Sequence, residues 1–266
     1  MNLGSIFSKR GPLFSYGFGL AQGGVCFVAL GFIACPLGMA ELKEDDQAAL
    51  KAITAATAQA VEAAKAAKGV DGAGGTVYQR VCMACHGDTG QGNQQLRTPS
   101  IAGLPDWYVM AQLGKFRNRL RGAHEKDLSG AQMQAIAMSL DEGQMKEAAA
   151  EIAKMPLHAT RNTLKGDAQQ GMNVYNDQCM ACHRYNGSGE VAFRSGQLVG
   201  LQDWYMLGQL EKFRAGIRGA DRKDEDGIRM QEIANRLRDQ DLADVLAYVA
   251  QLAEQYVGEL NATAGK

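Results

Sequence analysis

The pentapeptide Cys-x-x-Cys-His occurs twice in this chain, at residues 82–86 and 179–183. This spacing is the attachment signature of a c-type haem, in which two thiols add to the vinyl groups of one haem and the adjacent imidazole binds its iron. One short helical turn places both sulfurs and the ring on the same side, so each segment must fold against a haem. The sequence therefore predicts two covalently bound haem c groups, which indicates electron transfer.

The residues assigned to haem attachment are the cysteine pairs and the histidine that follows each pair: Cys82, Cys85 and His86, then Cys179, Cys182 and His183. A bare Cys-x-x-Cys also occurs in dithiol redox pairs and in halves of zinc sites. Neither chemistry requires a histidine directly after the second cysteine, and neither predicts that the whole unit recurs. A zinc site would draw its four ligands from motifs about a hundred residues apart, a spacing that zinc sites do not favour.

The two motifs belong to a longer internal repeat. Matching residues recur at a constant offset of 97 positions without a gap, from Tyr78 and Tyr175 to Ile136 and Ile233. Such self-similarity indicates the tandem duplication of one unit. Pro156 breaks the helical pattern between the copies. We therefore place one haem domain at residues 70–157 and the other at residues 158–266, and the length of 266 residues suits two domains.

Each unit is typical of the all-α class. We expect a helix before each haem motif, a helix around each Asp-Trp-Tyr, another around the repeated methionine and a closing helix. The closing helix is clear over residues 242–249 and weaker in the first copy, where Glu151 replaces Tyr248. A unit of this size cannot bury a large core, so the haem must supply much of the apolar mass. We expect the haem-free form to be poorly folded.

The N-terminal residues 1–40 are typical of a targeting or anchoring segment. A basic pair at residues 9–10 precedes an uncharged run at residues 11–40, which ends in small residues. We expect a secretory signal peptide, because haem c is attached outside the cytoplasm; the run is also long enough to remain as a membrane anchor. Both remaining cysteines, Cys26 and Cys35, lie in this segment, so no disulfide framework is implied.

Two further compositional features constrain the interpretation. Residues 41–69 are rich in alanine with scattered charges, which predicts a solvated helical spacer between the N-terminal segment and the first haem domain. The formal net charge is −1, so nothing in the charge balance indicates a nucleic-acid partner.

The repeat also selects candidates for the second axial ligand of each iron. Twin sites should use twin ligands, and only two methionine pairs match at the offset. Met83 and Met180 lie inside the motifs and cannot reach the far haem face. Met133 and Met230, each 47 residues after its haem histidine, remain as the predicted ligands. The alternative is that both are ordinary core residues, as most methionines in helical cores are.

Other repeated residues are candidates for contacts around the haem. The carbonyl of Pro99 could accept a hydrogen bond from the His86 ring and fix its orientation, with Gly196 at the matching place in the second copy. Residues that could bind haem propionates are two arginines and two Trp-Tyr pairs: Arg121, Arg218, Trp107, Trp204, Tyr108 and Tyr205. The alternative is solvated arginines and ordinary aromatic packing.

These motifs together resemble the class I c-type cytochromes, and specifically the dihaem cytochrome c4 group. The resemblance rests on Cys-x-x-Cys-His-Gly, Pro-x-Ile-Ala-Gly, Trp-Tyr, Gln-Leu-x-x-Phe-Arg and Met-x-x-Ile-Ala-x-x-Leu, between residues 74 and 252. It implies two cytochrome c folds in contact, with haems close enough to exchange electrons. It also implies a periplasmic carrier between a quinol-oxidising complex and a terminal oxidase or reductase. The second copy departs from the pattern at Arg184 and Gly196.

Two alternatives to a mobile electron carrier remain open. The first is a fixed electron-transfer subunit of a membrane respiratory complex or dehydrogenase, tethered to the inner membrane by an uncleaved N-terminal segment. The second is an enzyme, such as a dihaem peroxidase or a thiosulfate-oxidising protein. An enzyme would need a displaceable ligand or His or Cys ligation at one haem, whereas the matched Met133 and Met230 predict a filled coordination sphere.

Overall fold

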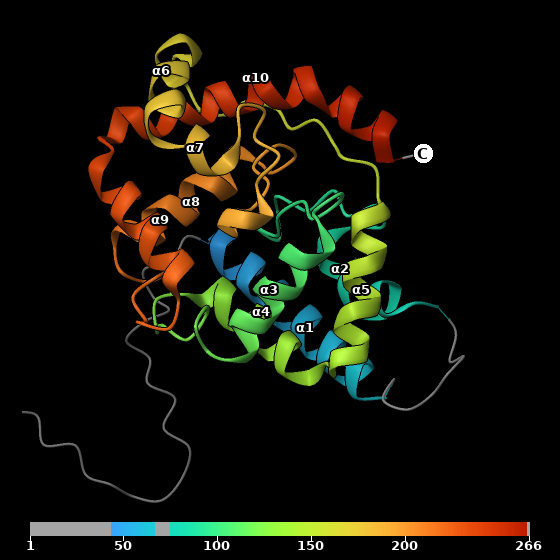
Figure 1. Cartoon of the computed structure of the whole chain (residues 1–266). Helices are drawn as coiled ribbons and strands as arrows, with labels where there is room; N and C mark the ends of the chain where they lie inside the picture. The colour runs from blue at the N-terminus through green and yellow to red at the C-terminus, as the bar shows by residue number, and fades with distance from the viewer. Residues whose placement is uncertain (1–43, 67–74, 265–266) are drawn as a thin grey trace, which may run out of the picture. The chain divides into compact units, whose positions relative to one another are not determined.

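A computed structural model describes residues 44–66 and 75–264 of the chain. The expected signal or anchor segment at residues 1–40, with Cys26 and Cys35, lies outside the described residues. The described part is helical, as predicted, and carries no β-strand; two isolated bridges, Asn93–Thr98 and Glu190–Ser195, close the loops after the haem motifs (Figure 1). No helix within the described ranges is long and apolar enough to cross a membrane.

The helices repeat in the order that the duplication predicts. The described part begins with α1 (Glu44–Ala66). The first copy contains the π-helical turn η1 (Tyr78–Cys82) and the helices α2 (Met83–His86), α3 (Asp106–Arg117), α4 (Leu128–Ser139) and α5 (Glu142–Lys154). The second copy contains α6 (Ala168–Gln178), α7 (Met180–His183), the short 3₁₀ turn η2 (Val191–Phe193), α8 (Asp203–Arg214), α9 (Glu225–Arg236) and α10 (Asp239–Ala264).

The two copies differ in how their first and last helices form. In the second copy α6 packs across α10, and Tyr175 lies against Tyr248 with ring centroids 5.4 Å apart (Figure 1). In the first copy the closing helix does form, as α5, because Asp141 and Gln144 make a reciprocal capping box at its start. The described part of the helix before the first motif is short and contains the π turn η1.

The alanine-rich segment is a helix, but the expectation of a solvated spacer was wrong. Ala60 and Ala64 of α1 are buried in the same core cluster as the first haem domain. The side-chain amide of Gln144 donates a hydrogen bond of 3.2 Å to the carbonyl of Ala64. The alanines allow α1 to approach η1, α2 and α4 closely, so low side-chain bulk serves packing here as well as helix propensity.

Each methionine-bearing helix begins at a buried aspartate cap. Asp127 accepts a hydrogen bond of 2.9 Å from the Gly130 amide, and Asp224 accepts one of 3.1 Å from Gly227. Gly122, with φ of 80°, passes so close that a Cβ there would lie 2.2 Å from the Gly130 carbonyl oxygen. Glycine is therefore required at residue 122 to bring the preceding loop against α4.

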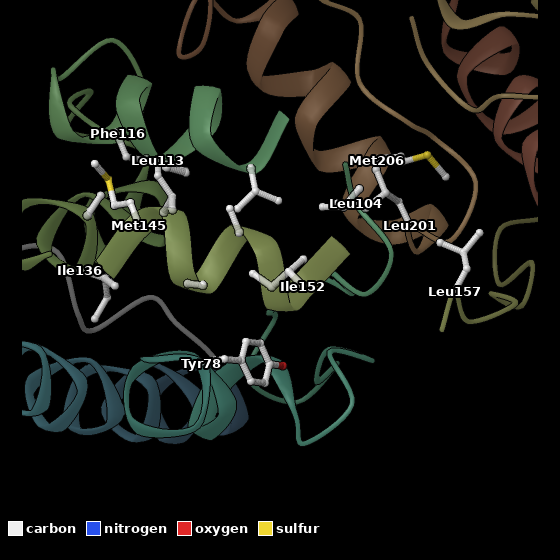
Figure 2. Packing of buried hydrophobic residues seen from close by; sticks show 14 of the residues in the cluster. Tyr78, Leu104, Leu113, Phe116, Ile136, Met145, Ile152, Leu157, Leu201 and Met206 are labelled. Atoms are coloured by element: carbon white, nitrogen blue, oxygen red, sulfur yellow. The ribbon is translucent and has the colours of Figure 1, made fainter. Parts of the chain in front are cut away.

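One continuous apolar cluster joins the two haem domains. It includes the repeat-equivalent residues Leu104 and Leu201, which lie near each other and near Met206 in Figure 2. Leu157, from the segment between the domains, is also buried in it. A Cβ on either Gly103 or Gly200 would lie within 3.0 Å of Leu157 Cδ1, so one leucine fills the equivalent place of both domains.

Reciprocal ion pairs fasten the domains to each other. Lys115 Nζ lies 2.6 Å from the carboxylate of Asp224, and its repeat equivalent Lys212 lies 2.6 Å from that of Asp127. Lys115 also pairs with Asp226 at 3.0 Å. Both aspartates are helix caps with little exposed surface, so dissolved salt weakens these ion pairs less than it weakens exposed pairs. The interface thus has approximate twofold symmetry.

We expect these pairs to make the domain interface sensitive to acid. Burial alone would raise the pKa of Asp127, but the hydrogen bond and charge of Lys212, with the Gly130 amide, hold it below its ordinary value. A carboxylate with a lowered folded pKa contributes stability above an unfolded pKa of about 3.9, and that contribution is lost as the pH falls through the folded pKa. Urea unfolding from pH 7 to pH 3 should show a smaller loss of stability in Lys212→Met than in the unmodified chain. Equal pH dependence in the two proteins would contradict this.

Candidate functional site

Both haem motifs open into one continuous cavity. Its lining includes the attachment residues of the first copy, Cys82, Cys85 and His86, and those of the second, Cys179, Cys182 and His183. The rest of the lining is mainly apolar and is drawn from both domains. The sequence repeat could not show that the two sites share a cavity, because this depends on how the domains pack.

Each motif histidine is held by a backbone carbonyl. The His86 Nδ1 atom lies 2.8 Å from the carbonyl oxygen of Pro99, and His183 Nδ1 lies 2.7 Å from that of Gly196. A ring that donates from Nδ1 leaves Nε2 free to bind iron. The two geometries are nearly equal, although one carbonyl belongs to proline and the other to glycine. The second copy therefore needs the same carbonyl but not the proline ring.

The structure gives a steric reason for Gly196. A Cβ at this position would lie 2.5 Å from the ring of Tyr108, which comes from the other domain. Any larger residue would push Tyr108 out of the interface. The departure from the proline of the first copy thus reflects the contact between domains.

The first thiol of each motif, that of Cys82 or Cys179, has a raised pKa. Burial, with the charges of Glu151 and Cys85, raises the pKa of Cys82 to about 12, and burial with the charge of Cys182 raises that of Cys179 to about 12. Reactive dithiol pairs have lowered thiol pKa values. Cys82 and Cys179 therefore do not have the environment of a reactive dithiol thiol.

Side chains that the sequence analysis did not assign fix the loops after the motifs. The buried hydroxyl of Tyr78 donates to the Gly87 carbonyl at 2.5 Å, and its equivalent Tyr175 donates to Arg184 at 2.6 Å. The hydroxyl of Thr98 likewise donates to the Cys85 carbonyl, as does that of Ser195 to the Cys182 carbonyl. The matching of Tyr78 with Tyr175 in the repeat was the available signal for the first pair.

The repeated methionines lie where the sequence analysis placed them, on α4 and α9. Met133 and Met230 both line the cavity that the motif histidines line. Met206, on α8, lines it too and is buried, but its counterpart in the first copy is Val109. The repeat and the cavity together therefore single out Met133 and Met230 as the matched thioethers.

A cluster of two arginines and two glutamines lies in the cavity between the domains. Arg121 donates to Gln112 at 2.8 Å and to Gln209 at 3.0 Å, while Arg218 donates to Gln209 at 2.8 Å and to Gln112 at 3.1 Å. Arg121 also donates to the hydroxyl of Tyr205 at 2.8 Å. The role of the glutamines was missed, because their spacing signals nothing until the domains are packed.

This cluster concentrates positive charge at a site where Arg121 is buried and Arg218 is half-buried. Each guanidinium lies 4.5 Å from the ring centroid of a phenylalanine of its own domain, Phe116 or Phe213. Burial, and then the charge of Arg121, lowers the pKa of Arg218. The guanidinium charges also lower the pKa of Tyr205 despite its burial. None of the ion pairs found among the described residues includes either arginine. A buried cation pair of this kind calls for an anion.

Trp107 and Trp204 are not part of the cavity lining. Each packs edge-on against the tyrosine that follows it, with ring centroids 5.7 and 6.2 Å apart. Tyr108 and Tyr205 do line the cavity. The tryptophans therefore contact the tyrosines without lining the cavity. The tyrosines remain the candidates for haem contact that reach it.

The residues present fit two haem c groups. Each site offers paired thiols, an imidazole oriented by a carbonyl, a thioether on a facing helix and an apolar surround. Between the sites, the unpaired charge of Arg121 and Arg218 suits the propionates that a haem carries.

Comparison with known proteins agrees with this chemistry. The family model described as Cytochrome c matches residues 72–155 and again residues 168–253. The thiosulfate dehydrogenase electron acceptor of Thiomonas intermedia is 32% identical over 152 residues, covering 53% of this chain and 65% of the relative. The chain thus spans just under two thirds of the length of that relative. Cytochrome c4 of Thiocapsa roseopersicina is 29% identical, over 68% of this chain and 92% of the relative.

A solved structure supports the same assignment. Cytochrome c4 of Acidithiobacillus ferrooxidans superposes with a TM-score of 0.53 at 27% identity, covering 64% of this chain and 96% of that chain. The haem-motif repeats, the shared cavity and the doubled family match converge on two covalently bound haem c groups. The chain belongs to the cytochrome c family, with two cytochrome c domains in tandem, and is similar to the dihaem cytochromes c4.

Proposed function

We propose that this protein is an electron carrier that accepts and passes on single electrons through two haems. Haem c, when bound, supplies a one-electron ferric–ferrous couple. The observation that supports this function most directly is that both motif sites open into one cavity, lined by residues of both domains. Two sites joined in this way suit electron exchange between them.

In the proposed sites, His86 and Met133 bind one iron, and His183 and Met230 bind the other. The carbonyls of Pro99 and Gly196 hold the imidazole rings in place, which limits the rearrangement that accompanies a change of oxidation state. A thioether ligand favours the reduced iron and raises the potential. With a histidine and a methionine both bound, each iron would have no open position for oxygen, peroxide or another substrate.

The arginine cluster acts on the same couples electrostatically. Arg121 and Arg218, held by Gln112 and Gln209, would bind the propionates where the domains meet. Their positive charge opposes the extra positive charge of a ferric iron and so favours the ferrous state. Tyr108 and Tyr205 complete this proposed propionate site.

The identity of the redox partners is a further part of the proposal. A periplasmic carrier would accept electrons from a quinol-oxidising complex and deliver them to a terminal oxidase or reductase, free or tethered to the inner membrane by its N-terminal segment. A second candidate donor is a thiosulfate-oxidising dehydrogenase, because a relative with 32% identity is named for accepting electrons from that enzyme. An enzymatic role for this chain itself would require an open iron, which the paired methionines disfavour.

Replacement of either proposed methionine ligand should affect one haem only. The oxidised protein should show the weak near-infrared charge-transfer band of Met–iron ligation, and Met133→Ala and Met230→Ala should each remove about half of it. Met206→Leu, which changes another methionine of the same cavity, should retain the full band. A full band in either alanine variant, or a high-spin haem in the unmodified protein, would refute the assignment.

Removal of an interface arginine should lower the haem potentials. Arg218→Gln should favour the ferric state by about 1–2 kcal/mol, the order of magnitude for loss of a unit charge near a redox centre at an effective dielectric constant near 20. Arg117→Gln removes the same charge from an exposed position on α3 and should have a much smaller effect. Redox titration of both haems measures the difference. Equal shifts in the two variants would exclude a specific role for Arg218.

A reconstitution assay separates the two candidate donors. The oxidised protein is mixed with a purified quinol-oxidising complex and quinol, or with a thiosulfate dehydrogenase and thiosulfate, and haem reduction is followed by absorbance. The true donor should reduce both haems at a rate that depends on donor concentration. Reduction by neither donor, with both Met–iron bands present, would leave the carrier function standing and would exclude both partners.

A further inference from the structure

Helix α1 bridges the two sides of the first haem site. It contacts α2, which carries Cys85 and His86, and also α4, which carries Met133. A haem held by that histidine and that methionine would lie between these two helices. A helix that touches both would then lie along one edge of that haem. Ile53 and Thr57 of α1 line the cavity itself, so the helix closes this edge with side chains.

This closure is an addition to the cytochrome c domain. The family match begins at residue 72, whereas α1 ends at Ala66. In the second copy, no helix of the described part has comparable contacts with both α7 and α9. The second cysteine of each motif differs in exposure in the same sense, since Cys85 is half-buried and its equivalent Cys182 is exposed. The duplicated domains thus present unequal haem edges.

The uncovered edge of the second domain carries exposed apolar side chains. Val191 and Phe193 are exposed, and Phe193 also reaches the cavity that would hold the haem. Met180 is exposed as well, to the same extent as its equivalent Met83. The first copy has Gln94 where the second has Val191, and Leu96 where it has Phe193. The exposed pair Val191 and Phe193 beside the second haem motif is the kind of apolar surface that a transient redox interface uses.

Arginines surround this apolar surface. Arg184, Arg194 and Arg229 have more than half of their side-chain surface exposed, and Arg194 and Arg229 also line the cavity. Their equivalents in the first copy are Gly87, Arg97 and Gln132. Each of the three is ion-paired, Arg184 with Glu190 and both Arg194 and Arg229 with Asp226, so three arginines against two carboxylates leave an excess of one positive charge. Such a rim attracts a partner with acidic side chains around its own redox centre.

We propose that α1 closes the haem edge of the first domain and that an acidic redox protein docks at the haem edge of the second domain, ringed by Arg184, Arg194 and Arg229. This inference rests on the proposed carrier function and names the surface that it uses. The first haem then exchanges electrons with partners only by way of the second. In this proposal the protein can hold two electrons and exchanges both with its partners at the haem edge of the second domain.

The covering role of α1 can be tested by proton NMR of the oxidised holoprotein with a soluble gadolinium chelate. Met133→His and Met230→His assign the paramagnetically shifted methyl resonances to each haem. The chelate should broaden the resonances of the second haem and spare those of the first. Ala64→Glu, which buries a charge under α1, should expose the first haem to the chelate. Ala58→Glu, the same change on the exposed face of α1, should not.

The outcomes of this experiment are decisive. Equal broadening of both haems in the unmodified protein would overturn the closure by α1, as would continued protection of the first haem in Ala64→Glu. Should Ala64→Glu fail to fold, Ala60→Glu tests the same buried face at another position. Failure of the carrier function itself would appear separately, as the loss of Met–iron charge-transfer bands from the unmodified protein.

The docking surface can be tested with hexacyanoferrate(III) as an anionic oxidant of the reduced protein. Arg229→Gln should slow the second-order rate about threefold at low ionic strength, and the difference should disappear at high salt. Gln132→Glu changes the net charge by the same amount at the equivalent position of the first domain and should leave the rate unchanged. Equal slowing by both variants would show that the oxidant responds to overall charge and would overturn the assignment to the second domain.

Discussion

The covalent link between each haem and its Cys-x-x-Cys-His segment is the constraint on which the rest of the structure depends. It fixes the position of one large apolar group in each domain, and short helices with few large side chains need that group to fill the cavity between them. The carbonyls of Pro99 and Gly196, the hydroxyls of Tyr78 and Tyr175 and the capped helices α4 and α9 hold the protein around that fixed point.

The sequence was most informative where a feature was local or repeated. The motif spacing, the 97-residue offset and the matched methionines required no knowledge of packing, and the helical class followed from the same patterns. Two predictions concerned long-range contacts and fared worse. The segment 41–69 looked solvated because its apolar stripe is thin, but Ala60 and Ala64 are buried through close approach, which hydropathy does not register. Trp107 and Trp204 precede tyrosines that line the cavity but do not line it themselves.

Duplication followed by local divergence explains the asymmetry of the molecule. The interface keeps its approximate twofold symmetry in Lys115 and Lys212, in Arg121 and Arg218, and in their partners. The outer surfaces do not, since α1 packs on the first domain, whereas the exposed Val191 and Phe193 lie after the second haem motif, where the first copy has Gln94 and Leu96. Contacts between the domains are constrained by both copies at once, whereas each outer face can change alone.

Leu157 has a consequence for how such a fused pair can evolve. Leu157 packs beside both Gly103 and Gly200. The length of the segment that connects the domains must therefore suit both domains at once. An inserted or deleted residue between Met155 and Thr160 would withdraw the leucine from at least one of them and leave a hollow. The length of this connecting segment is therefore fixed. Either domain, if separated from the other, would expose an apolar surface that is buried in the pair.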